Sequence, residues 1–212
     1  MKTATKVRLR FAKHGDLRFI SHHDLMRCLE RLLRRARIST AMSQGFNPRP
    51  KIVFTLALAL GIEGRDEVVE IELAEPMEPD QVLERLRATT PQGLEWLAAE
   101  ALGPGRAAQP NTVSYQIQVP ADRQEEGRQR LASFLASSEF PYTRHRPDRT
   151  VSIDLRPFLL EAEFDPLGLL RFRMKMLPSG SARPEEILDA LGLRDLLGLG
   201  AVLVRTELEL VP

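Results

Sequence analysis

Five arginines followed by a polar, proline-rich loop are the strongest chemical signal in this sequence. The arginines fall between Arg27 and Arg37, and the loop runs from Ser43 to Lys51. Guanidinium groups bind phosphate oxygens, and an aromatic ring beside them can stack on a nucleobase. The pattern therefore predicts a nucleic-acid contact, whose candidate residues are Arg27, Arg31, Arg34, Arg35, Ser43, Gln44, Phe46, Asn47, Arg49 and Lys51.

The loop also allows a purely structural interpretation. Phe46 either stacks on a base or fills the core, and Pro48 and Pro50 stiffen the chain in both cases because proline fixes φ. For Arg49 and Lys51 we favour binding, since no acidic residue lies near them in the sequence.

A second basic cluster, Arg-His-Arg-Pro-Asp-Arg, occupies residues 144–149. One interpretation is a hairpin turn with local Asp–Arg pairs, followed by the turn-like segments 154–157 and 180–184. The other is a second surface that contacts phosphates. Arg144 and Arg146 are therefore further candidates for nucleic-acid binding.

Two histidines precede the arginines, and His22 and Asp24 are the weak candidates for acid–base chemistry. A neutral imidazole near a carboxylate can transfer protons at physiological pH. His22 and His23 are adjacent, so on a helix they point about 100° apart and cannot easily share a metal ion. The alternative is that Ser21 caps the helix, with Asp24 three residues later completing a capping box.

Other catalytic signals are missing from the sequence. It has no G-x-S-x-G elbow, no P-loop, no G-x-G-x-x-G and no three-cysteine motif. Cys28, the single cysteine, falls on the apolar side of the arginine helix and is expected in the core. We therefore expect no cofactor and no metal, and we favour a protein without catalytic activity of its own.

The charge of the chain is strongly segregated although the net charge is only +1. Residues 1–60 hold thirteen basic and three acidic residues, a net of +10, whereas residues 61–104 hold three basic and eleven acidic ones, a net of −8. Either the basic segment serves an acidic partner, or the acidic segment packs beside it and neutralises it. No apolar run is long enough to span a membrane, and we expect a cytoplasmic protein.

The elements that position these residues follow from hydrophobic periodicity. The first half predicts strands at 6–13, 51–60, 67–73 and 94–102, with helices at 22–36 and 78–88. The second half predicts strands at 114–119, 158–164, 169–176 and 202–210, helices at 122–136 and from 184, and short strands at 140–145 and 149–155. The fold class is α+β, with two tandem ferredoxin-like (βαββαβ) domains, 1–103 and 111–212, joined by a linker at 104–110.

Three stretches, 18–27, 33–36 and 43–50, resemble the bacterial radical-SAM-linked protein family, a domain of unknown function. Residues 154–157 and 182–184 are similar to its second half. The resemblance implies a separately encoded radical SAM partner and a role near RNA or a ribosomal component. That family commonly has His-Leu-Asp where this chain has His22-His23-Asp24, which leaves His22 and Asp24 as the better candidates. The expected architecture also resembles that of CRISPR RNA-processing endonucleases.

Three functions follow as hypotheses. The favoured one is an accessory protein that binds RNA, or presents a substrate, for a radical SAM enzyme in RNA or ribosome-related modification. The second is a metal-independent ribonuclease with His22 as general acid or base. The third is a subunit that docks on its protein partner without contacting RNA.

Overall fold

The computed structural model describes residues 4–145, 149–177 and 180–211, and it has a mixed α+β fold. The chain divides into two compact units: unit 1 runs to Pro110 and includes Val211, and unit 2 runs from Asn111 to Leu210. The division after Pro110 falls at the end of the segment in which the sequence predicts a linker.

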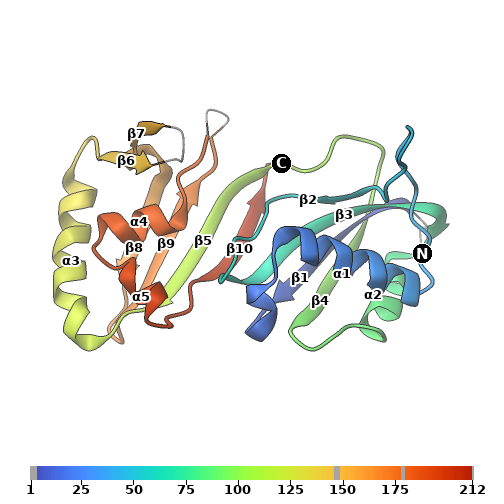
Figure 1. Cartoon of the computed structure of the whole chain (residues 1–212), viewed down its shortest axis with the longest axis horizontal. Helices are drawn as coiled ribbons and strands as arrows, with labels where there is room; N and C mark the ends of the chain where they lie inside the picture. Colours follow the sequence, from blue (N-terminus) through green and yellow to red (C-terminus); the bar gives the residue numbers. More distant parts are fainter. Residues whose placement is uncertain (1–3, 146–148, 178–179, 212) are drawn as a thin grey trace. The chain divides into compact units, whose positions relative to one another are not determined.

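Unit 1 contains an antiparallel sheet with helices. Its elements are β1 (Ala4–Lys13), a 3-10 turn (Gly15–Phe19), α1 (His22–Arg35), β2 (Ile52–Phe54), β3 (Glu63–Met77), α2 (Pro79–Arg87) and β4 (Leu94–Leu102). The strands lie in the order β4-β1-β3-β2 and each pair is antiparallel. The predicted order of strands and helices in this half is therefore present, and Figure 1 shows both helices beside the strands they connect.

One face of the unit 1 sheet forms the core. Alternate residues of β1 and β3, among them Leu9 and Ile71, pack against Leu29 of α1 and Leu86 of α2 in a single buried cluster. The apolar stripe of α1 follows the predicted 3.6-residue spacing, with Leu25, Leu29, Leu32 and Leu33 buried and Cys28 half-buried. Burial of this stripe fixes which side of α1 remains for the arginines.

The strand predicted at 51–60 is much shorter in the structure. Strand pairing with β3 covers only Ile52 to Phe54. One further hydrogen bond, from the Thr55 amide to the Val68 carbonyl at 3.1 Å, follows it. Beyond that point Leu58 is still buried, although it lies outside any strand. An apolar run predicts burial, but it does not say whether the backbone joins a sheet.

Unit 2 also contains a sheet with helices. Its elements are β5 (Pro110–Gln118), α3 (Ala121–Ala136), β6 (Pro141–His145), β7 (Thr150–Asp154), a 3-10 turn (Arg156–Phe158), β8 (Leu159–Phe164), β9 (Leu169–Lys175), α4 (Pro184–Ala190), α5 (Asp195–Gly198) and β10 (Val204–Leu210). The main strands lie in the order β10-β5-β9-β8. Strands β6 and β7 form a separate antiparallel hairpin between α3 and β8, where the sequence predicts two short strands (Figure 1).

Candidate nucleic-acid interface

The outer side of α1 carries a row of exposed arginines. Arg27, Arg31 and Arg34 are spaced by four and three residues, so they lie along one face of the helix. Arg27 has a loose pair with Asp24 at 3.5 Å, with 72% of its side chain exposed. Within the described residues, no carboxylate lies within ion-pairing distance of Arg31 or Arg34. A row of uncompensated guanidinium groups can bind successive anionic groups.

Arg35 and Lys51 differ from this row because each has a partner. The Arg35 guanidinium donates to the Thr89 carbonyl at 2.8 Å, and the Lys51 ammonium pairs with the Glu72 carboxylate at 2.7 Å. The absence of an acidic residue nearby in the sequence therefore does not leave Lys51 unpaired in the structure. Glu72 is distant in the sequence and becomes a neighbour only through the pairing of the chain with β3. Both side chains nevertheless stay at the surface.

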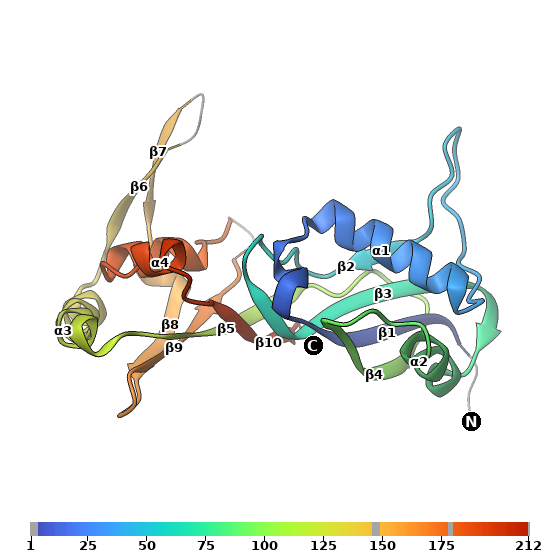
Figure 2. The same cartoon turned by 60° about the horizontal axis from the view of Figure 1, so that its bottom comes forward.

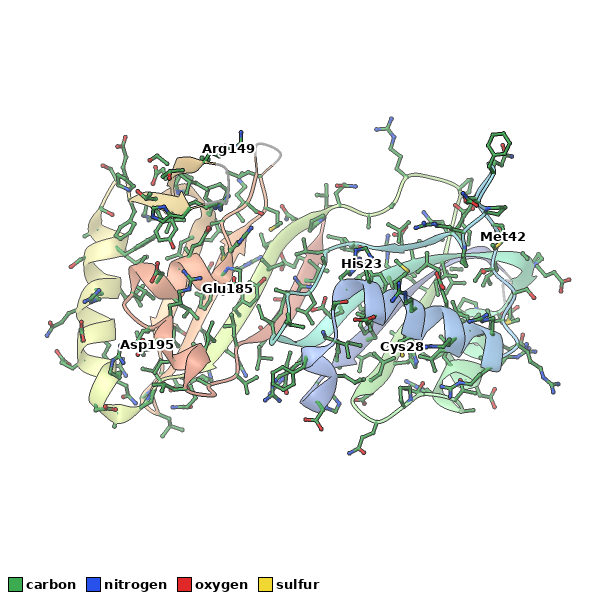
Figure 3. The ribbon with its side chains drawn as sticks, viewed as in Figure 1. His23, Cys28, Met42, Arg149, Glu185 and Asp195 are labelled. Atoms are coloured by element: carbon green, nitrogen blue, oxygen red, sulfur yellow. The ribbon has the colours of Figure 1, made fainter. Side chains whose placement is uncertain are left out.

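The loop between α1 and β2 is closed at its base by two hydrogen bonds between Ser43 and Arg49. The Ser43 amide donates to the Arg49 carbonyl at 2.8 Å, and the Arg49 amide donates to the Ser43 hydroxyl at 2.9 Å. Met42 and Pro50 form an isolated bridge below them. Figure 2 shows this segment projecting from unit 1, and Figure 3 marks Met42 where the chain enters it. The Ser43 hydroxyl thus helps to hold the loop together.

The tip of the loop exposes the remaining candidates. Gln44, Asn47 and Arg49 are exposed, and the Phe46 side chain is completely exposed at 106% relative area. The alternative that Phe46 fills the core is therefore wrong. Leaving a phenylalanine in water forgoes about 1.5–3 kcal/mol of burial free energy. The Phe46 ring is therefore available to a ligand, and it lies on a loop, the kind of segment that often carries binding residues.

Arg37 is an exposed arginine that is not among the candidate contacts predicted from the sequence. It follows the end of α1 with φ of 54°, in the left-handed region that favours glycine. The Ile38 amide donates to the Leu33 carbonyl at 2.9 Å and the Arg37 amide to the Arg34 carbonyl at 3.1 Å, which is the Schellman pattern. The sequence signal for this left-handed position is that the helix ends after Ala36 with no glycine there, so that another residue must take the position that glycine usually occupies.

The weak catalytic candidates lie at the start of α1. Ser21 is the N-cap, its hydroxyl accepts from the Asp24 amide at 3.2 Å, and it donates to the Asp24 carboxylate at 2.7 Å. The hydrogen bond from Ser21 lowers the pKa of Asp24. His22 packs edge-on against Phe54, with ring centroids 5.2 Å apart, and has no carboxylate partner within the described part of the chain. Capping explains Asp24, and no proton relay links it to His22.

Removing the cap tests this assignment. We expect Ser21→Ala to lower the free energy of unfolding by about 1 kcal/mol, because the Asp24 amide loses its acceptor. Urea denaturation of the full chain measures the change, and Ser21→Asp, which restores an acceptor, is the matched control. Equal stability of wild type and Ser21→Ala would contradict the capping role.

His22 offers a test by pH. Burial, followed by the nearby charges of His23 and Lys13, lowers the pKa of His22 below its ordinary value of 6.5. The folded state therefore holds fewer protons than the unfolded state as pH falls, so stability should decline below about pH 6.5, whereas His22→Phe should decline less. An NMR titration gives the midpoint directly, and a value above 6.5 would contradict the assigned environment.

Arg144 is not available as a surface contact. Its guanidinium makes a double hydrogen bond with the nearly buried Glu186 carboxylate, at 2.6 and 2.7 Å, and also donates to the Ser181 carbonyl at 3.1 Å. This arrangement corrects the expectation that Arg144 contacts phosphate, since its donors are directed inward. Arg146 lies outside the described residues. The neighbouring Asp154 accepts from the Phe140 and Arg156 amides, at 2.7 and 3.0 Å, and so fixes the end of the hairpin.

The described residues contain neither a metal-binding cluster nor a membrane-spanning helix. No group of three or more His, Cys, Asp or Glu side chains among them is arranged to hold a metal ion. In the same residues, no helix combines the length and apolar character needed to cross a bilayer.

Comparison with solved structures gives only distant similarity. A chain in a crystal structure of a Cbf5-Nop10-Gar1 complex matches 96% of this chain at 15% identity with a TM-score of 0.43, and this chain spans 49% of that one. A crystal structure of an unknown protein from Galdieria sulphuraria matches over 100% of both chains at 12% identity, with a TM-score of 0.29. No curated protein matches the chain.

The sequence itself matches a family profile over most of its length. The profile, described as an uncharacterized protein conserved in bacteria (DUF2344), covers residues 6–184. This range includes the whole of α1, the loop after it and the hairpin of unit 2. The chain is therefore a member of this bacterial family.

Proposed function

We propose that the protein is an accessory RNA-binding protein that presents RNA, or a ribosomal component carrying RNA, to a separately encoded radical SAM enzyme. The observation that supports RNA binding is the row of exposed arginines on α1, of which Arg31 and Arg34 have no carboxylate partner among the described residues, next to a loop that exposes Phe46. The proposal of a radical SAM partner is supported by the resemblance of three stretches, residues 18–27, 33–36 and 43–50, to the radical-SAM-linked family. Such a role places the protein in the cytoplasm.

The proposed architecture is a tandem pair of ferredoxin-like domains. In unit 1 the elements follow the order β-α-β-β-α-β, and the strand order β4-β1-β3-β2 is consistent with this fold. Unit 2 supports the same plan if the β6–β7 hairpin is an insertion after α3, because its main strands lie in the corresponding order β10-β5-β9-β8. In unit 1 the helices cover one face of the sheet, and α1 presents its arginines on the side away from the core.

The charge distribution in unit 1 supports a binding role for α1 rather than for β1. On β1, Lys6 and Arg8 pair with Glu70 at 2.8 and 2.9 Å, and Arg10 pairs with Asp66. Burial opposes the charged form of Glu70, but hydrogen bonds from Lys6 and Arg8 outweigh it and lower the pKa of that carboxyl. The basic residues of β1 are thus paired with acidic residues of the same unit. Arg31 and Arg34 have no such pair among the described residues, so their guanidinium groups are available to a binding partner.

The direct test is binding of bulk cellular RNA to the purified protein at low and at high salt. If several phosphates are engaged, the affinity should fall steeply as salt rises, because each contact releases condensed counterions. A protein-docking role predicts instead that the radical SAM partner co-purifies after nuclease treatment while RNA does not bind. Intact RNA after prolonged incubation in EDTA would count against the ribonuclease alternative.

A further inference from the structure

A groove of about 530 Å³ lies between the C-terminal end of α1 and the base of the loop. Its apolar lining includes Leu33, Ile38, Met42 and Pro50, and the guanidinium-bearing residues Arg34 and Arg37 belong to its rim. Pockets that bind small organic groups are typically apolar with a few convergent polar groups, and this volume is in their usual range. The groove therefore has the composition expected of a site for a flat, partly apolar ring that is attached to an anion.

The backbone around the groove is fixed by hydrogen bonds. The Ala41 amide donates to the Glu72 carbonyl at 2.8 Å, and the Ala74 amide donates to the Ser39 carbonyl at 2.9 Å, so residues 39–41 are held against β3. On the other side of the groove, the Ile38 amide donates to the Leu33 carbonyl and so fixes the end of α1. These bonds make the groove a preformed site, which lowers the entropy cost of binding.

The polar rim matches the edge of a nucleobase and its phosphate. Glu30 lines the groove and offers a carboxylate that can accept from an exocyclic amino group, while Ser39 and Thr40 offer hydroxyls. Neither Arg34 nor Arg37 has an ion-pair partner among the described residues, so both remain free for phosphate oxygens. The Schellman turn holds the Arg37 backbone in the left-handed region and so fixes its position beside the groove.

We propose that this groove binds one unpaired nucleobase of a single-stranded RNA. The adjoining phosphate contacts Arg34 and Arg37, and a neighbouring base stacks on Phe46, which lies four residues from both Met42 and Pro50. Four extended residues span at most about 13 Å, so a short run of nucleotides can reach both sites. A duplex does not fit, since its bases are paired and stacked. The inference rests on the proposed RNA binding and specifies the form of RNA.

The test compares three labelled RNAs of the same length by fluorescence anisotropy: a 12-nucleotide single strand, the same strand in a duplex, and the same strand with abasic sites. The single strand should bind at least about tenfold more tightly than the other two. Arg37→Gly should weaken binding of the single strand at least about threefold, because one phosphate contact is lost, while leaving the melting temperature equal or higher, because glycine suits the left-handed position. Arg106→Gly, the same change at an exposed linker arginine, should leave the preference intact.

The possible outcomes separate the two proposals. Equal, salt-dependent binding of all three RNAs would overturn the nucleobase groove but leave the proposed RNA binding standing. If Arg37→Gly left the affinity for the single strand unchanged, the groove as described would likewise be rejected. Failure of every RNA to bind would overturn both proposals and favour an acidic protein as the partner of the basic surface.

Discussion

Reversing the charge of Arg31 and Arg34 together is expected to weaken RNA binding about 100-fold. Both side chains are exposed, and neither arginine has a carboxylate partner among the described residues. Each charge-assisted hydrogen bond contributes roughly 1.5 kcal/mol or more, so the loss of two corresponds to about two powers of ten in affinity. The dependence of log K on log salt should also become shallower by about 1.4, since each single-strand contact contributes about 0.7. Titration of the Arg31→Glu/Arg34→Glu variant with RNA at several salt concentrations measures both quantities.

A matched charge change in unit 2 is the control. Arg130→Glu/Arg194→Glu alters the net charge by the same amount at two exposed positions, on α3 and beside α5. It should change RNA affinity less than about threefold if RNA contacts the α1 arginines directly, because neither residue belongs to α1 or its loop. Equal losses in the two variants would show that RNA responds only to net charge and would remove the assignment to α1. Circular dichroism of each variant checks that the fold persists.

The α1 helix shows why much of the fold was predictable from the sequence. Its apolar residues recur with helical spacing and Ser21 begins it, so both its position and its buried side follow from local information, and the structure confirms them. Strand β1 is similar, because Val7, Leu9 and Phe11 alternate with charged residues. The run after Phe54 shows the limit, since its pairing depends on β3 rather than on its own composition.

The candidate site was predictable only where a residue's environment is local. The arginine row on α1 follows from helical spacing, whereas the partners of Lys51 and Arg144 lie 21 and 42 residues away. Such partners are brought near by the tertiary fold, and no local pattern signals them. Arg37 differs in part: its left-handed conformation belongs to the local Schellman turn, whereas the groove beside it depends on the pairing of Thr40 with Leu73 of β3.

Arg144 therefore provides the second large expected effect, on stability rather than on binding. Arg144→Ala removes both hydrogen bonds to Glu186 and leaves that carboxylate, which is only 5% exposed, with the Arg183 amide as its donor at 2.8 Å. An uncompensated buried charge usually costs 3–5 kcal/mol, and the slight exposure of this pair places the expected loss at about 3 kcal/mol. Hydrogen exchange over residues 141–145 and 150–154 should accelerate together with the loss of global stability in urea, because Arg144 lies on the hairpin that it anchors to α4.

The effect of Arg144→Ala should depend on pH in a defined direction. Burial opposes the charged form of Glu186, but hydrogen bonds from Arg144 and the Arg183 amide outweigh it and lower the pKa below the ordinary 4.5. A lowered carboxyl pKa contributes stability that is present above that value and is lost as pH falls. The difference in stability between wild type and variant should therefore be largest near pH 7 and shrink toward pH 3.

The control is Arg130→Ala, which breaks only the exposed pair with Glu126 and should lower the free energy of unfolding by about 0.3–0.5 kcal/mol. If Arg144→Ala instead kept full stability and lost RNA affinity, the residue would be a phosphate contact, and the inward pairing would have no structural role.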